Sequence, residues 1–376
     1  MMNNKFDDIR PYNDSEISPA MQRISMDNYF ALLSSFVFPS KNVDDVREMV
    51  SSIRTVHEFQ NEIMYKVNQR IIEQSISNLS YGGLDNISAD KSYLYISNHR
   101  DIMLDASLLQ NILVDHNFDT TEITFGANLM RGQLVIDIGK SNKMFRVERP
   151  SGNMRDFYFA SKHLSEYIRT AVCDRKSSVW IAQRNGRTKD GIDRTDQGII
   201  TMFRMSGKDM ITSIADLNIL PISISYEWEP CDMLKALELA ASKNGPYIKQ
   251  EGEDLNSIIT GILQFKGNVH IEVCKPITTD DLKQCEGMSS SDFNKYVASL
   301  IDRRICSNYK LMPNNYIAHD IVSNSTTYSE FYTQEQRESF IQHLDQANKF
   351  DNCDEIKDIL LGIYANPVES RIQFMK

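Results

Sequence analysis

The sequence has no long apolar run and no closely spaced pair of cysteines. No stretch approaches the roughly 18 apolar residues of a transmembrane helix. The polar, acidic start of the chain has none of the apolar core of a secretion signal. The six cysteines form no C-x-x-C motif, which argues against a disulfide framework or a zinc site. We therefore expect a cytoplasmic protein with reduced thiols.

An excess of positive charge is also missing. The chain of 376 residues has a formal net charge of −10, which argues against nucleic acid as a partner. The charge is uneven, because residues 131–208 hold 16 lysines and arginines against 8 aspartates and glutamates. A basic segment inside an acidic chain favours an anionic substrate or membrane headgroups as its partner. A solvated basic face without a partner is the alternative.

Hydrophobic patterning divides the chain into three parts. Residues 1–85 and 281–376 are predicted to be helical, whereas strands and helices alternate over residues 86–280. This alternation predicts an α/β domain in which helices flank a mostly parallel sheet. The strands are expected at 92–97, 122–126, 133–138, 143–148, 178–183, 219–226 and 268–274. The helices of the second and third parts are expected at 102–114, 153–172, 194–205, 254–265, 291–308, 329–348 and 352–364.

The N-terminal part contains a helix signal and a short apolar run. Ser18 and Pro19 predict a helix start, with the serine as N-cap and the proline in the first turn, and a second helix is expected from near Asn42. Residues 29–38 are apolar over most of their length but too few to span a bilayer. Packing on the domain is our preferred interpretation, and a position in a membrane interface is the alternative.

The segment YLYISNHRDIMLD (residues 93–105) joins a predicted buried strand to a predicted helix. Its first four residues are β-prone, and apolar residues recur at helical spacing from Ile102 onward. His99 should therefore lie where a strand ends and a helix begins, which is where open α/β sheets bind ligands. Asp101 and Asp105 are both near enough in sequence to orient His99 as a general base. The alternative is a helix cap at Asp101 and an ordinary loop histidine.

Three further segments end predicted strands with residues suited to ligands, at 139–152, 179–191 and 219–230. The first two are rich in arginine and lysine, and an arginine can bind a phosphate through two parallel hydrogen bonds. The second segment also contains a glycine, which lets the backbone approach a ligand closely. The candidate ligand-binding residues are Arg146, Arg149, Gly186, Arg187, Thr188, Lys189 and Tyr226.

In this order the four segments resemble the sequence blocks of the glycerolipid acyltransferases. The first block of that family has the form N-H-x-x-x-x-D, and SNHRDIMLD stands in its place here. The second block ends in F-I-R-R or a variant, to which FRVER at residues 145–149 is similar. The third has the form E-G-G-R-S-R-T-G, and RNGRTKDG at residues 184–191 keeps the Gly-Arg pair and the last glycine. The fourth places a proline inside a strand, as LPISISYE does.

The resemblance has two departures. In the family the aspartate follows the histidine by five residues, where this chain has Leu104, while Asp105 comes one residue later and Asp101 three residues earlier. We prefer Asp105 as the partner of His99, because a helix cap accounts for Asp101. Arg184 takes the place of the glutamate in the third block, which suggests a changed acceptor pocket.

The resemblance implies an O-acyltransferase of phospholipid biosynthesis, attached peripherally to the inner face of the membrane. His99 would remove a proton from an acceptor hydroxyl, which then attacks an acyl thioester carried by coenzyme A or acyl carrier protein. The acceptor would be a glycerol phosphate such as glycerol 3-phosphate, or a lysophospholipid such as lysophosphatidate. Arg149 and Arg187 would hold its phosphate, and Gly186 would support an oxyanion. No metal or cofactor is implied beyond the thioester.

Two other functions remain open on the sequence alone. One is an O-acyltransferase for a lipid acceptor without glycerol, which the arginine in the third block favours. The other is a non-catalytic lipid-binding protein that kept the fold, which the altered first block favours. A phosphohydrolase is a more remote alternative, since no metal-binding cluster of carboxylates is evident.

Overall fold

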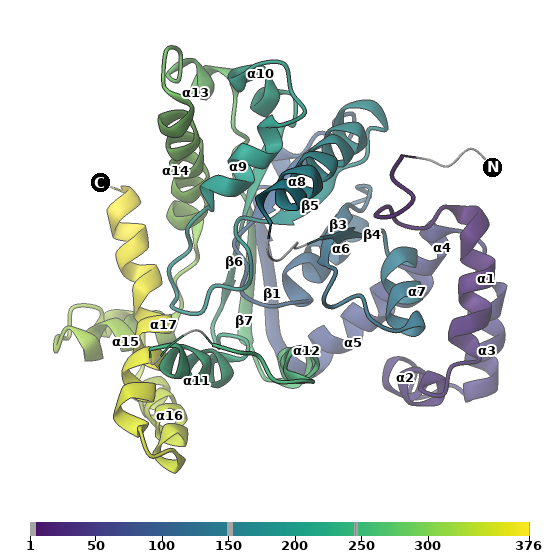
Figure 1. Cartoon of the computed structure of the whole chain (residues 1–376). Helices are drawn as coiled ribbons and strands as arrows, with labels where there is room; N and C mark the ends of the chain where they lie inside the picture. Colours follow the sequence, from purple (N-terminus) through teal and green to yellow (C-terminus); the bar gives the residue numbers. More distant parts are fainter. Residues whose placement is uncertain (1–4, 149–152, 244, 246, 376) are drawn as a thin grey trace.

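The computed structural model describes residues 5–148, 153–243, 245 and 247–375. A seven-stranded sheet lies at its centre, and helices cover both faces of the sheet (Figure 1). Five of the six strand pairings in these residues are parallel. The predicted α/β class with a mostly parallel sheet is therefore confirmed.

The sheet has the strand order β1-β7-β6-β2-β5-β3-β4. Strand β7 runs antiparallel to β6, whereas β6, β2, β5, β3 and β4 are all parallel to one another. The carboxyl ends of these five strands consequently meet at one edge of the sheet. The strands are β1 Ile76–Gly82, β2 Leu94–Ser97, β3 Glu122–Gly126, β4 Met144–Val147, β5 Val179–Ala182, β6 Ile219–Tyr226 and β7 Gly267–Val273.

The N-terminal region is helical, as predicted, but ends earlier than residue 85. Its helices are α1 Asp14–Ser25, α2 Phe30–Val37, α3 Val43–Ser52, α4 Val56–Phe59 and α5 Tyr65–Ser75. The predicted start at Ser18 is wrong, because Asn13 caps α1 and its N–H donates to the Glu16 carboxylate at 2.8 Å. Pro19 therefore lies inside the helix. No helix in the described part of the chain is long and apolar enough to cross a membrane.

Two elements of the sheet region differ from the sequence prediction. Residues 76–82 form the edge strand β1, whose hydrogen-bond partner β7 lies about 190 residues later, too distant for a local pattern to show. The predicted strand at 133–138 is wrong, because Gln133–Ser141 form helix α7. This helix packs Leu134 on the N-terminal helices, and its buried Asp137 accepts a 2.8 Å hydrogen bond from Arg23.

The other predicted elements are found within a few residues of their expected bounds. The helices that follow β2 are α6 Leu104–Asp115, α8 Met154–Arg169, α9 Gln197–Arg204, α10 Met210–Ala215, α11 Asp232–Ser242, α12 Glu253–Leu263, α13 Thr279–Lys283, α14 Ser290–Asn308, α15 Pro313–Val322, α16 Gln334–Leu344 and α17 Cys353–Met375. Helix α17 is longer than expected and continues through Pro367. The region expected at 329–348 is one helix, α16, between two short 3-10 turns.

The C-terminal helices pack against the sheet domain through a segment that follows β5. Asn366 of α17 donates a 2.7 Å hydrogen bond to the carbonyl of Asp190. The next residue, Gly191, has a positive φ of 76°, and a Cβ built there would lie 2.2 Å from the carbonyl oxygen of Ile363. The close approach of α17 therefore requires glycine at this position.

We expect Gly191→Ala to lower the free energy of unfolding by about 3 kcal/mol, since it adds a backbone clash to the cost of a left-handed conformation. Gly186→Ala is the matched control, because Gly186 also has a φ of 76° but nothing lies within 4 Å of its Cβ position. It should cost only about 1–2 kcal/mol. Urea unfolding measures both values, and equal losses would contradict the proposed contact.

Candidate active site

His99 lies between β2 and α6, at the edge where the carboxyl ends of the parallel strands meet. Its Nδ1 is 2.9 Å from Oδ2 of Asp105, which belongs to the first turn of α6. The histidine side chain is 15% exposed, whereas that of Asp105 is 1% exposed. The carboxylate is thus shielded from water, while the imidazole reaches the surface with Nε2 on the side away from Asp105. The structure pairs His99 with Asp105 and not with Asp101.

The Asp105 carboxylate accepts three further hydrogen bonds. Its Oδ2 accepts from the backbone N–H groups of Arg100 at 2.6 Å and Asp101 at 2.9 Å. Its Oδ1 accepts from the hydroxyl of Tyr226 at 2.9 Å. Burial, and then the charge of Asp105, raise the pKa of Tyr226 well above its usual value, so the phenol remains a donor. These bonds fix the carboxylate, which in turn holds the His99 imidazole with Nδ1 protonated.

Asp101 has a structural position at the start of α6. Its Oδ1 accepts from the backbone N–H groups of Met103 at 2.9 Å and Leu104 at 2.8 Å, as the predicted helix cap would. Burial, and next the charge of Asp105, raise the pKa of Asp101. The geometry therefore explains why two nearby aspartates differ: one caps the helix and the other orients the histidine.

The loop that carries His99 is fastened to the neighbouring strands. The His99 carbonyl accepts a 2.7 Å hydrogen bond from the N–H of Thr188, and the Asn98 side chain bonds to Asp193 at 3.0 Å. Trp180 of β5 meets the imidazole edge to face, with ring centroids 6.0 Å apart. Strand β5 and the segment after it therefore contact both the backbone and the imidazole ring of His99.

A buried ionic cluster that the sequence did not reveal lies behind this loop. The guanidinium of Arg100 is 2.6 Å from Asp193 and 3.2 Å from Glu229, and Lys235 is 2.5 Å from Glu229. Lys235 also donates to the Arg100 carbonyl at 2.7 Å. All four side chains are at most 4% exposed. In the sequence these four residues are recognisable only as charges within or beside apolar segments. That pattern does not show which residue pairs with which.

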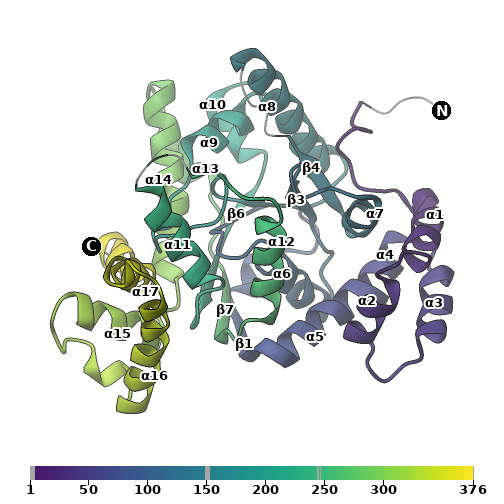
Figure 2. The same cartoon turned by 60° about the horizontal axis from the view of Figure 1, so that its bottom comes forward.

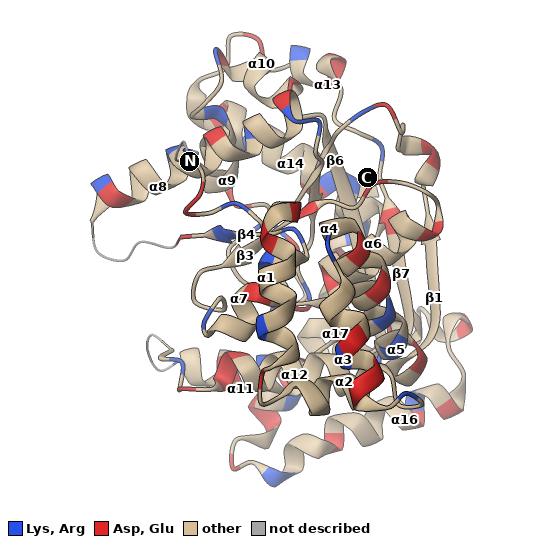
Figure 3. Ribbon diagram, turned by 90° about the vertical axis from the view of Figure 1, so that its right-hand side faces the viewer, with Lys and Arg blue, Asp and Glu red and all other residues tan. Residues whose placement is uncertain are grey.

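Two of the predicted ligand residues keep polar groups available at this edge. Arg187 is 8% exposed and its Nη1 has no hydrogen-bond partner among the described residues. Its charge acts to lower the pKa of Asp101, which places it near the histidine loop. Arg146 lies on β4, half-exposed and 2.6 Å from Glu148. Figure 3 shows basic and acidic residues interspersed over the ribbon. Arg149 lies outside the described residues.

Three other predicted ligand residues have structural contacts instead. The hydroxyl of buried Thr188 donates to Asp193 at 2.8 Å, and Lys189 forms an ion pair with Glu238 of α11. Tyr226 is 1% exposed, and its hydroxyl donates to Asp105 at 2.9 Å. Sequence position alone could not show this, because residues at a strand end can face either the ligand or the scaffold. In this structure the three side chains contact the scaffold, and their role toward a substrate stays a prediction.

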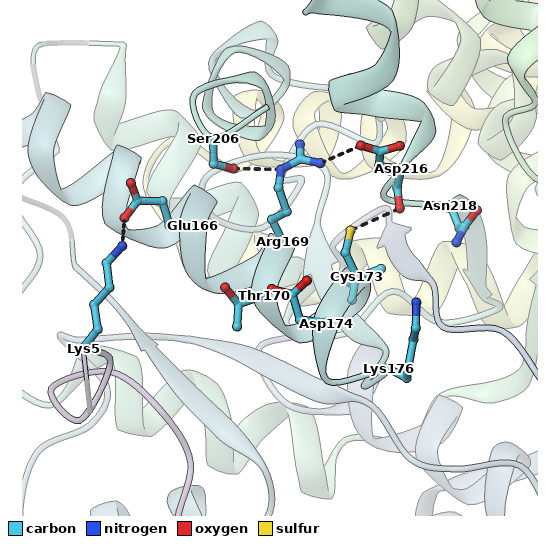
Figure 4. A pocket seen from close by; sticks show the side chains of 11 residues that line it. Lys5, Glu166, Arg169, Thr170, Cys173, Asp174, Lys176, Ser206, Asp216 and Asn218 are labelled. Carbon is cyan, nitrogen blue, oxygen red and sulfur yellow. Dashed lines mark hydrogen bonds and ion pairs between the residues drawn. The ribbon is translucent and has the colours of Figure 1, made fainter. Parts of the chain in front are cut away.

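Two surface hollows differ in their relation to His99. One, of about 430 Å³, lies at the carboxyl ends of β3 and β4, on the catalytic edge, and Arg131 and Arg146 are among its lining residues. The other, of about 520 Å³, lies at the opposite edge, where Lys176 and Asn218 precede β5 and β6 (Figure 4). Its central cation, Arg169, is bonded to Ser206 and Asp216. The first hollow is therefore the candidate substrate site.

The arrangement is suited to a reaction in which a proton moves to and from a substrate. A histidine oriented by a buried carboxylate supplies the base, and arginines nearby supply charge for an anionic substrate. Among the residues that the structure describes, no three His, Cys, Asp or Glu side chains are placed to hold a metal ion.

Comparison with known proteins shows what the central part of the chain is similar to. Residues 78–225, less than half of the chain, match the family model described as Acyltransferase, so this part of the chain is similar to that family. Among solved structures it is similar to the 1-acyl-sn-glycerophosphate (LPA) acyltransferase PlsC from Thermotoga maritima. The two are 13% identical, with a TM-score of 0.36, over 77% of this chain and 94% of the other. A comparison with curated proteins finds no match.

We expect Asp105→Asn to lower kcat by roughly 10²–10⁴, because an amide can stabilise the wrong tautomer of His99 and cannot stabilise its protonated form. Asp101→Asn should cost less than about tenfold, since asparagine caps a helix about as well as aspartate. Steady-state kinetics of the two variants tests this order. The opposite order would transfer the orienting role to Asp101.

Proposed function

We propose that this chain transfers a fatty acyl group from a thioester to a hydroxyl of a glycerol phosphate or a lysophospholipid, in phospholipid biosynthesis. The observation that carries the proposal is the His99–Asp105 pair, with Nε2 on the side of the partly exposed ring away from Asp105 and the carboxylate buried. The donor is an acyl-coenzyme A or an acyl carrier protein. The site works at the inner face of the membrane, to which the protein attaches peripherally.

The chemistry follows from the geometry of the pair. Nε2 of His99 takes the proton of the acceptor hydroxyl as its oxygen attacks the thioester carbonyl. The new carbon–oxygen bond forms, the carbon–sulfur bond breaks, and the departing thiolate takes the proton back from the imidazolium. Asp105 stabilises the imidazolium between these steps, and Tyr226 and two backbone N–H groups keep its carboxylate in place.

The acceptor phosphate is assigned to the basic groups along the same edge. Arg187 supports this assignment, because a buried guanidinium nitrogen without a partner is costly unless a ligand supplies one. Arg131 and Arg146 line the hollow at the ends of β3 and β4 and add positive charge there. A phosphate between them would gain charge-assisted hydrogen bonds.

We expect His99→Ala to reduce transfer by at least roughly 10²–10⁴ while the protein stays folded. The measurement is mass-spectrometric detection of the acylated product, with purified protein, acyl-coenzyme A or acyl carrier protein, and glycerol 3-phosphate or lysophosphatidate. Circular dichroism checks the fold. Near-native turnover of the variant would rule out the proposed base, and wild-type protein inactive with every pair would rule out the proposed substrates.

We expect Arg187→Lys to raise the Michaelis constant for the acceptor roughly tenfold to hundredfold, since lysine keeps the charge but loses the planar fork. The constant for the donor should change much less. The control is Arg194→Lys, an exposed arginine of the same segment. Kinetics is measured in detergent at low and high salt. A defect that persists at high salt indicates a buried contact, whereas one that salt removes indicates exposed surface charge. Equal behaviour of the two variants would remove Arg187 from the acceptor site.

A further inference from the structure

Helix α12, outside the segment that matches the family model, has an apolar outer face. Leu255, Ile259 and Leu263 recur every four residues, so they lie on one side of the helix. They are 60%, 47% and 61% exposed, and Phe265 just beyond the helix is 56% exposed. No charged residue occurs from 255 to 263. An exposed helix face without charge is unusual for a surface that meets only water.

The opposite side of α12 lies directly on the catalytic loop. A Cβ built on Gly261 would be 2.1 Å from Oδ2 of Asp101, so only glycine allows the helix to come this close. At the start of the helix, Asp254 accepts a 3.0 Å hydrogen bond from Asn128, which lines the hollow beside β3. The helix therefore covers the site with one face and presents its apolar residues outward with the other.

Helix α2, more than 200 residues away in sequence, presents a similar face on the same side of the molecule. Tyr29, Leu32 and Leu33 are 64%, 68% and 39% exposed, while Phe30 packs inward. Helices α2 and α12 both contact α5. In Figure 1 they lie at a similar height on either side of α5, and both come forward in Figure 2. The apolar run at residues 29–38 thus both packs on the protein and exposes apolar side chains.

We propose that α12, together with α2, forms a face that lies in the boundary between headgroups and acyl chains of a phospholipid bilayer. This inference rests on the proposed function, because it names the surface from which the lipid acceptor reaches His99. Because the exposed apolar residues belong to two separate helices, an extended surface such as a bilayer can contact both of them more readily than a short peptide can. Arg131 and Arg146, in the hollow joined to α12 through Asn128, would lie near the lipid phosphates.

The charge and the area of the outer side of α12 disfavour protein partners. An acidic acyl carrier protein needs basic contacts, and the outer face of α12 has none between residues 255 and 263. A helix of 11 residues is about 16 Å long. Its outer side is much smaller than the roughly 800 Å² that each partner buries in a stable dimer. A bilayer requires no such minimum area.

The test uses the triple variant Leu255→Gln, Ile259→Gln, Leu263→Gln in the full chain. Glutamine is a good helix former, and exposed substitutions seldom change stability by more than about 0.5 kcal/mol. The control is Val322→Gln with Met375→Gln, two apolar residues that are 60% and 67% exposed elsewhere. Binding is measured by sedimentation with vesicles of phosphatidylcholine and phosphatidylglycerol, and transfer is measured with a vesicle-embedded acceptor and a short-chain, water-soluble acceptor.

The triple variant should bind vesicles at least tenfold more weakly than wild type and lose activity on the embedded acceptor to a similar degree. Its kcat on the soluble acceptor should be unchanged, and the control should resemble wild type throughout. Unchanged vesicle binding by the triple variant would overturn the proposal. So would light scattering that shows a wild-type dimer and a monomeric variant, since the face would then join two copies. Wild-type protein that binds vesicles but transfers no acyl group would refute the proposed function and leave this face standing.

Discussion

The burial of the Asp105 carboxylate is the constraint on which the site depends. A carboxylate 1% exposed is stable only if hydrogen bonds replace its lost water. Here the donors come from the loop after β2, from the histidine and from the end of β6. The start of α6 adds its positive helix end. The same contacts that make the buried charge tolerable also fix the orientation of His99, so stability and function share one set of atoms.

The ionic cluster behind the loop extends this constraint to the rest of the chain. Arg100, Asp193, Glu229 and Lys235 carry two positive and two negative charges, so the buried group is neutral when all are ionised. Removing one partner leaves an unpaired buried charge, which is much worse than replacing the whole group by apolar residues. The cluster therefore makes the segments after β2, β5 and β6 depend on one another, because each supplies a charge that the others neutralise.

The sequence could predict what local patterns encode and little of what distant partners decide. Adjacent residues predict the junction at His99 and the capping role of Asp101. They also predict all six strands other than the one expected at 133–138, to within two residues. Strand β1 forms because β7 pairs with it, and α7 forms because the N-terminal helices cover it. The sequence also does not show that the hydroxyls of Thr188 and Tyr226 bond to Asp193 and Asp105, because only the fold brings each pair together.

The contact of α17 with Gly191 affects how the protein can be divided. The carbonyl of Ile363 lies against this glycine, and Asn366 bonds to the residue before it. The loop that supports His99 is therefore held from outside by a helix close to the end of the chain. The segment that matches the family model ends at residue 225, so the matched segment is smaller than the part of the chain that shapes the candidate site. A chimera that takes its C-terminal helices from a relative would therefore also need the relative's loop around Asp190 and Gly191.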